Sequence, residues 1–152
     1  MLTWLDTTVL VAGLVAAHPD HDVCRIHLSQ ASATPGSYRC TAHALAETFR
    51  VLVALPLKPR IQPAAALIAI RTSLMTRLNP LPLTTADYEQ AFDLVVGSTL
   101  GAGAVYDALH LVGAERMGAK RLLTTNISHF SALAQTTRSP VNILRPHEAK
   151  AQ

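Results

Sequence analysis

Three acidic side chains lie inside apolar segments of this 152-residue chain, and they limit how the chain can fold. Asp6 interrupts LTWLDTTVLVAGLV, Glu47 lies in TAHALAETFRVLVAL, and Asp107 opens DALHLVGAERMGA. Burying an ionised carboxylate costs about several kcal/mol unless a cation or hydrogen-bond donors compensate it. Each acid alone is more simply explained as a partly exposed helix-end or ion-paired residue. For all three together, we favour a shared divalent-metal site that folding assembles.

Short apolar segments alternate with segments of helical spacing along the whole chain. We expect strands at Leu2–Leu5, Tyr38–Thr41, Arg121–Thr124 and Val141–Leu144, and helices after Asp6 and at Asp22–Ala31, Ala42–Ala54, Ala64–Leu78, Thr85–Gly97 and Tyr106–Gly118. Such alternation predicts an α/β domain with a mostly parallel sheet.

Several residues have the character of helix boundaries. Thr7 and Thr8 can cap the first helix, and Thr84 or Thr85 can cap a later one, because their hydroxyls accept from free backbone N–H groups. Gly118 is a natural helix stop. The glycine-rich GSTLGAGAV, in contrast, is expected to be a flexible lead-in to the helix that carries Asp107.

Function in parallel sheets is found at the carboxyl ends of the strands. Asp6 directly follows the first expected strand, and TTN, which ends at Asn126, directly follows a later one. Glu47 and Asp107 would have to enter from helices that pack beside those strand ends.

Composition indicates one globular domain. Hydrophobic residues make up 49% of the chain and charged residues 15%, which excludes a disordered chain. The early apolar run from Val9 to Ala17 is shorter than the roughly 20 residues that a bilayer needs. The residues before this run contain no Lys or Arg, but they include Asp6, and this charge pattern argues against a secretion signal. We therefore expect a cytoplasmic protein. The surplus apolarity instead favours a subunit interface or a partner groove.

Cysteine and histidine placement does not indicate a zinc site. Cys24 and Cys40 have no ligand spacing and are expected to be small buried hydrophobes. His18 and His21 are expected in surface or capping roles, since no third ligand lies nearby. The net charge of +3 is a weak indication of a phosphate-rich partner, because an arginine codon bias would give the same charge.

Two further histidines lie near the expected site. His110 follows Asp107 by three residues and could touch the edge of the site, but we favour packing within the helix. His129 could contact a substrate, but a loop-surface position is the simpler expectation. Arg50 is within one helical turn of Glu47, and it is equally suited to contacting a phosphate or to neutralising Glu47.

These elements, in this order, resemble the PIN-domain ribonucleases, and most closely their VapC-type toxins. The resemblance rests on DTTVLV at Asp6, AETFRVL at Glu47, YDALHL at Asp107 and TTNISHF, with HPDHDVC resembling the family's usual HP-x-H stretch. It runs from residue 2 to about residue 145. It implies one PIN-like domain over residues 1–147, a short tail over residues 148–152, and three α/β/α layers around a mostly parallel sheet.

The resemblance also implies the site. Asp6, Glu47 and Asp107 match the family's three acids, and its fourth position, often aspartate, is Asn126 here. Thr8 replaces a more common asparagine or serine and can still act as a hydrogen-bond donor. The implied activity is Mg²⁺-dependent endonucleolytic cleavage of RNA, with Mn²⁺ able to substitute, because both ions prefer hard oxygen ligands. With one carboxylate fewer, we expect one well-held ion and a second that needs substrate phosphate.

Partners and alternatives follow from the same resemblance. The family implies an RNA substrate, a homodimer, no membrane, and a VapB-like antitoxin whose segment covers the active-site groove and often places an arginine among the acids. One alternative is a catalytically weak PIN-like module that binds RNA or protein. Another is a metal phosphohydrolase of a different kind, acting on DNA. Retention of all three acids favours the ribonuclease.

Overall fold

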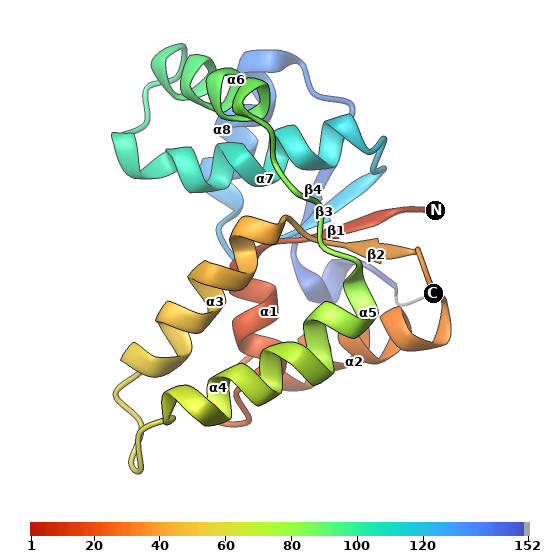
Figure 1. Ribbon diagram of the computed structural model, residues 1–152. Helices are drawn as coiled ribbons and strands as arrows, with labels where there is room; N and C mark the ends of the chain where they lie inside the picture. The colour runs from red at the N-terminus through yellow and green to blue at the C-terminus, as the bar shows by residue number, and fades with distance from the viewer. Residues whose placement is uncertain (151–152) are drawn as a thin grey trace.

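Four short parallel strands form a sheet at the centre of the molecule. In the computed structural model, which describes residues 1–150, the strands lie in the order β2-β1-β3-β4 (Figure 1). Their bounds are β1 Thr3–Leu5, β2 Tyr38–Arg39, β3 Arg121–Leu123 and β4 Asn142–Leu144. The expected strands and their parallel pairing are thus confirmed. No helix within this part of the chain is both long and apolar enough to cross a bilayer.

Helices cover both faces of the sheet and complete three layers (Figure 1). One face is covered by α1 (Thr7–Leu14), α2 (His21–Ala33), α3 (Ala42–Ala54), α4 (Pro63–Ile70) and α5 (Thr76–Leu78), and the other by α6 (Thr85–Val96), α7 (Val105–Arg116) and α8 (Ile127–Thr137). Successive strand residues point to opposite faces. Accordingly Leu5 and Leu123 belong to the first core, while Trp4 and Leu122 belong to the second.

The long helix expected over Ala64–Leu78 is interrupted. A π-helical turn, Arg71–Met75, separates α4 from α5. The Thr72 hydroxyl donates to the Ile68 carbonyl at 2.9 Å, and the Thr76 hydroxyl donates to the Thr72 carbonyl at 3.0 Å. Hydroxyls that bond back to carbonyls four residues earlier bend helices, which gives a physical reason for the wider turn.

Two other local expectations were wrong. Asp6, rather than Thr7 or Thr8, is the N-cap of α1, and both hydroxyls form tertiary hydrogen bonds instead. The expected flexible lead-in contains a 3-10 turn, Ala102–Ala104, whose Ala104 side chain is buried. Tertiary contacts therefore order both segments.

Helix α8 was not expected from the sequence. Its apolar residues Ile127, Phe130 and Leu133 recur every three residues, and the last two are fully buried. This spacing is helical, but it lies inside the polar segment TTNISHFSALAQTT, which has the composition of a loop. The helix matters because it begins directly after Asn126.

The strand order places a crevice where the carboxyl ends of β1 and β3 meet. From β1 the chain first adds β2 on one side of β1, and it later adds β3 on the other side. The switch point of the sheet therefore lies between β1 and β3. The Asp6 N–H donates to the Leu123 carbonyl at 3.1 Å, which fixes Asp6 at this crevice.

Candidate active site

Asp6 is the most enclosed of the three carboxylates, with 2% of its surface exposed. Its position at the end of β1 follows from the buried strand before it. The Thr8 and Thr124 hydroxyls both donate to Asp6 Oδ2 at 2.8 Å. The Thr8 oxygen in turn accepts the Thr125 N–H at 3.1 Å, which ties the start of α1 to the segment after β3. The carboxylate is therefore held from both strands of the crevice.

Glu47 reaches the crevice from α3, which begins directly after β2. The Thr41 hydroxyl caps this helix by accepting the Ala44 N–H. Thr7 Oγ1 donates to Glu47 Oε2 at 3.4 Å. Glu47 Oε1 lies 3.2 Å from His43 Nε2, but the angle does not make a hydrogen bond, and both atoms are buried without another partner. One oxygen of Glu47 is thus available for a ligand.

Asp107 lies in the first turn of α7, where the helix dipole favours a negative charge. Its Oδ2 accepts a hydrogen bond from Asn126 Nδ2 at 2.9 Å and lies 2.9 Å from His129 Nδ1. Both partners belong to the start of α8. The position of Asp107 therefore depends on the helix that the sequence did not reveal.

Neighbouring carboxylates disfavour the ionised forms of Glu47 and Asp107. Burial, followed by the charges of Asp6 and Asp107, raises the pKa of Glu47 to about 7. Burial and then Asp6 raise the pKa of Asp107 to about 6. Carboxylates that destabilise each other's charge are those that a divalent cation would stabilise.

A buried hydrogen-bonded chain connects two of the carboxylates to the second core. The Trp4 indole N–H donates to His110 Nδ1 at 3.4 Å, so the proton of the neutral imidazole lies on Nε2. His110 Nε2 lies 3.0 Å from Thr7 Oγ1 and 3.5 Å from Asp6 Oδ1. Burial lowers the pKa of His110, although Asp6 opposes the shift. A neutral His110 therefore orients both Thr7 and Asp6.

The donor set fits a hard divalent cation. Within residues 1–150, no three His, Cys, Asp or Glu side chains converge closely enough to enclose an ion in this conformation. Asp6 and Asp107 instead turn one oxygen each toward protein hydrogen-bond donors. The buried Glu47 Oε1 without a hydrogen-bond partner and three mutually repelling oxygen donors at one crevice are suited to Mg²⁺ or Mn²⁺.

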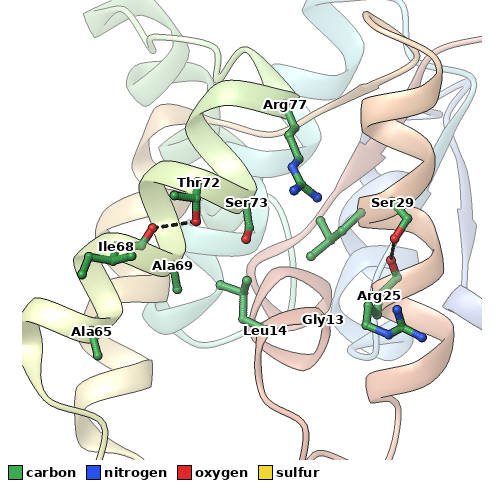
Figure 2. Close-up of a pocket in the computed structure, with 11 residues that line it drawn as sticks. Gly13, Leu14, Arg25, Ser29, Ala65, Ile68, Ala69, Thr72, Ser73 and Arg77 are labelled. Atoms are coloured by element: carbon green, nitrogen blue, oxygen red, sulfur yellow. Dashed lines mark hydrogen bonds between the residues drawn. The ribbon is translucent and has the colours of Figure 1, made fainter.

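Two cavities lie near these elements. One, of about 450 Å³, is lined by His43, Ala46, Glu47, Arg50 and Tyr106, and so adjoins a carboxylate of the site. The other is a groove of about 510 Å³ between α1, α2 and the α4–α5 segment, and none of the three acids lines it. Figure 2 shows this groove, with the Arg77 guanidinium directed into the space between the helices.

The sequence-based site residues are brought together as a group. Asn126 donates a hydrogen bond to Asp107. The charges of Asp6 and Glu47 interact with the charge of Asp107. His110 touches the site after all, so packing alone was the wrong preference.

Other contacts were missed or underestimated. His129 lies in the first turn of α8 rather than on a loop surface. The contacts of Thr7, His43 and Thr124 were not anticipated. For the contact between His43 and Glu47, the available signal in the sequence was their spacing of four residues on one helix.

Sequence comparison places most of the chain in a known family. The family model described as PIN domain matches residues 4–135. Ribonuclease VapC40 of Mycobacterium tuberculosis, from two strains, is 34% identical over 122 residues, which cover 80% of this chain and 84% of the relative.

Solved structures with low sequence identity share the fold. The Mycobacterium tuberculosis VapC20, described as a sarcin-ricin loop cleaving toxin, has a TM-score of 0.63 at 20% identity, covering 79% of this chain and 86% of its own. FitAcB from Neisseria gonorrhoeae has a TM-score of 0.66 at 15% identity, covering 97% of this chain and 100% of its own. A FitAB structure bound to a DNA fragment has a TM-score of 0.65 at 16% identity, covering 98% of each chain.

Proposed function

Because this chain belongs to the PIN-domain family, we propose that it is a VapC-type endoribonuclease toxin that requires a divalent metal ion. The observation that carries the proposal is that Asp6, Glu47 and Asp107 lie around the carboxyl ends of β1 and β3, where burial and neighbouring carboxylates raise the pKa values of Glu47 and Asp107. The relative named a ribonuclease supports RNA as the substrate.

The metal we propose is Mg²⁺, for which Mn²⁺ can substitute. Asp6, Glu47 and Asp107 would hold it, because they are the oxygen donors of the crevice. When bound, such an ion lowers the pKa of water and offsets the charge on a phosphodiester. Asn126 adds a neutral side chain to this set, so the protein supplies three formal negative charges.

The surrounding residues restrain two of the three acids before any ligand binds. Thr8 and Thr124 restrain Asp6, while Asn126 and His129 restrain Asp107. Glu47 has no comparably short hydrogen bond, and its pKa is raised to about 7. Glu47 is thus the least restrained of the three acids, so we assign to it the orientation of a water molecule beside the proposed ion.

Removal of either principal acid tests the proposal. Asp6→Asn and Asp107→Asn keep the side-chain size and remove the charge, so we expect a loss of RNA cleavage of at least about 100-fold, a typical magnitude for an essential catalytic group. Cleavage of single-stranded RNA, duplex RNA and DNA is followed with and without Mg²⁺. Glu89→Gln, on the exposed surface of α6, is the matched control. Undiminished Mg²⁺-dependent cleavage by both site variants would disprove the assignment.

We also propose that a VapB-like antitoxin neutralises the enzyme and that the groove in Figure 2 receives part of it. Ile68 on its rim is 63% exposed, and Arg25 and Arg77 add positive charge. This surface suits a partner segment that combines apolar side chains with a carboxylate. The product of the adjacent reading frame should inhibit RNA cleavage, and Arg77→Glu should weaken that inhibition while cleavage itself persists. Equal inhibition of the variant would place the partner elsewhere.

A further inference from the structure

The pocket of about 450 Å³ beside Glu47 has no role in holding the three acids together. It lies between α3 and α7 and is lined by His43, Ala46, Glu47, Arg50 and Tyr106. Its volume falls within the range of about 300–1,000 Å³ that is usual for small-molecule sites. One wall, Glu47, belongs to the reaction centre, so a group bound here would be adjacent to the reacting phosphate.

Aromatic rings form one side of this pocket. The Tyr106 ring stacks on His43 with a centroid distance of 5.5 Å and an interplanar angle of 14°. Tyr88 holds the His43 ring from its edge at 6.4 Å and 83°, and Phe92 contacts Tyr88 in turn. Tyr106 is 48% exposed although it is a large aromatic side chain. The stack therefore presents a supported and solvent-accessible ring.

The α3 side of the pocket also carries a positive charge, that of Arg50. His43, Glu47 and Arg50 lie on one face of α3 because they are spaced by four and three residues. Arg50 is exposed, and its charge lowers the pKa of Glu47 only as the smallest of several contributions. Arg50 is thus free to bind an anion instead of being fully used in neutralising Glu47.

We propose that this pocket is a nucleotide subsite, in which a base adjacent to the cleaved phosphodiester stacks on Tyr106 and a neighbouring phosphate contacts Arg50. Unstacked bases are recognised by aromatic platforms, and backbone phosphates by nearby cations. The substrate is therefore a single-stranded RNA segment, because a base inside a duplex cannot reach the ring. This inference rests on the proposed ribonuclease function and extends it to the substrate class.

The test compares substrates that lack one base at a time. A short single-stranded oligoribonucleotide that the full chain cleaves is prepared with one abasic ribonucleotide at each position in turn. For the unaltered protein, we expect one position next to the cut to lower kcat/KM by roughly tenfold, which matches the value of a base–aromatic stack. Tyr106→Ala should lower kcat/KM on the intact substrate by a similar factor and show no further loss at that abasic position.

Control variants separate stacking from general disturbance. Tyr106→Trp keeps a flat ring and should retain the abasic penalty, whereas Arg50→Ala should raise KM and weaken the dependence of KM on salt. Phe49→Ala removes an aromatic ring of α3 that is 38% exposed and does not line the pocket, and it should cleave like the unaltered protein. An abasic penalty that Tyr106→Ala leaves unchanged at every position would overturn the subsite.

The outcome is distinguishable from failure of the proposed function. Cleavage that persists in Asp6→Asn would contradict the proposed ribonuclease site itself. A different pair of results would contradict only the subsite. In that case Asp6→Asn loses cleavage, while Tyr106→Ala and Arg50→Ala cleave every substrate as the unaltered protein does. Circular dichroism confirms that the variants are folded, and Tyr106→Trp tests the ring even where Tyr106→Ala unfolds.

Discussion

Single residues of the crevice differ in how their charge is compensated. Glu47 and Asp107 have side chains that are 20% and 18% exposed, and their pKa values are raised to about 7 and about 6. In the folded state both prefer to be protonated, relative to the unfolded chain. Their contribution to stability is therefore fully present below the ordinary pKa values of 4.5 and 3.8, and it is lost as pH rises through the raised values.

We expect the free energy of unfolding of the metal-free protein to fall over this window. For Glu47, a shift from 4.5 to about 7 corresponds to on the order of 3 kcal/mol. Urea unfolding in EDTA at several pH values measures this free energy of unfolding. Glu47→Gln should remove most of the fall between about pH 4.5 and pH 7 and leave the part that Asp107 causes between about pH 3.8 and pH 6, while Glu89→Gln should leave the whole profile unchanged. An identical profile for Glu47→Gln would contradict the raised pKa.

Asn126 sets the charge of the site. Asn126→Asp replaces the amide that donates to Asp107 Oδ2 with a fourth negative charge. We expect the metal-free variant to lose about 1–3 kcal/mol of stability, because a hydrogen bond is exchanged for repulsion. Calorimetric titration with Mn²⁺ should show tighter binding or a second ion, which we expect the natural protein to bind only with RNA. Unchanged stoichiometry and affinity would contradict a role for Asn126 in metal occupancy.

At the scale of elements, α7 links the site to the second core. Gly113 lies where α7 crosses β1, and a Cβ there would come within 2.8 Å of Trp4 Cζ2 and 3.2 Å of Thr41 Cγ2. Trp4 is fully buried and cannot move aside easily. Gly113→Ala should therefore destabilise the protein by about 1–3 kcal/mol, despite the better helix propensity of alanine.

Urea unfolding of Gly113→Ala measures this cost. Gly101→Ala is the matched control, since nothing lies within 4 Å of a Cβ at that position. Because Trp4 donates to His110, and His110 touches Asp6, the variant should also lower RNA cleavage. A variant as stable as the natural protein would mean that α7 shifts without cost.

Other elements show which local sequence signals suffice to predict a helix. The helix at Thr85 was anticipated with Thr84 or Thr85 as its cap, and the structure makes Thr84 the N-cap, with both reciprocal hydrogen bonds of a capping box to Asp87. Helix α8 was not anticipated, because its apolar spacing is short and lies among polar residues. The π-helical turn was also beyond prediction, since it arises from hydroxyl bonds whose formation a sequence does not reveal.

At the scale of the whole molecule, two cores share one sheet, and the proposed site lies at the carboxyl ends of its two central strands, β1 and β3. Metal binding should therefore stabilise the entire fold, because ions bind the assembled crevice and not the unfolded chain. Mg²⁺ at about 100 times its dissociation constant should add about 2.7 kcal/mol. Thermal unfolding with increasing Mg²⁺ measures the effect, and Asp6→Asn should abolish it. An equal gain in Asp6→Asn would assign the ion to another site.

Assembly and location are also properties of the whole molecule. The homodimer that the family resemblance implies stays a prediction, and analytical ultracentrifugation of the full chain measures it. A cytoplasmic location stays a prediction as well, and fractionation of cells that produce the protein measures it.

The sequence by itself determined the alternation of strands and helices and the position of Asp6 at a strand end, and the resemblance that it carries predicted a site of four residues. It did so because buried strands, caps and charged residues in apolar segments follow local rules of spacing and solvation. Only the tertiary structure decided that α8 brings Asn126 and His129 to Asp107, that His110 orients Asp6, and that Tyr106 stacks on His43. Those contacts join residues from different elements, and their distances depend on how both cores pack against one sheet. The three misplaced carboxylates were visible in the chain, but the neighbours that restrain them and raise their pKa values were not.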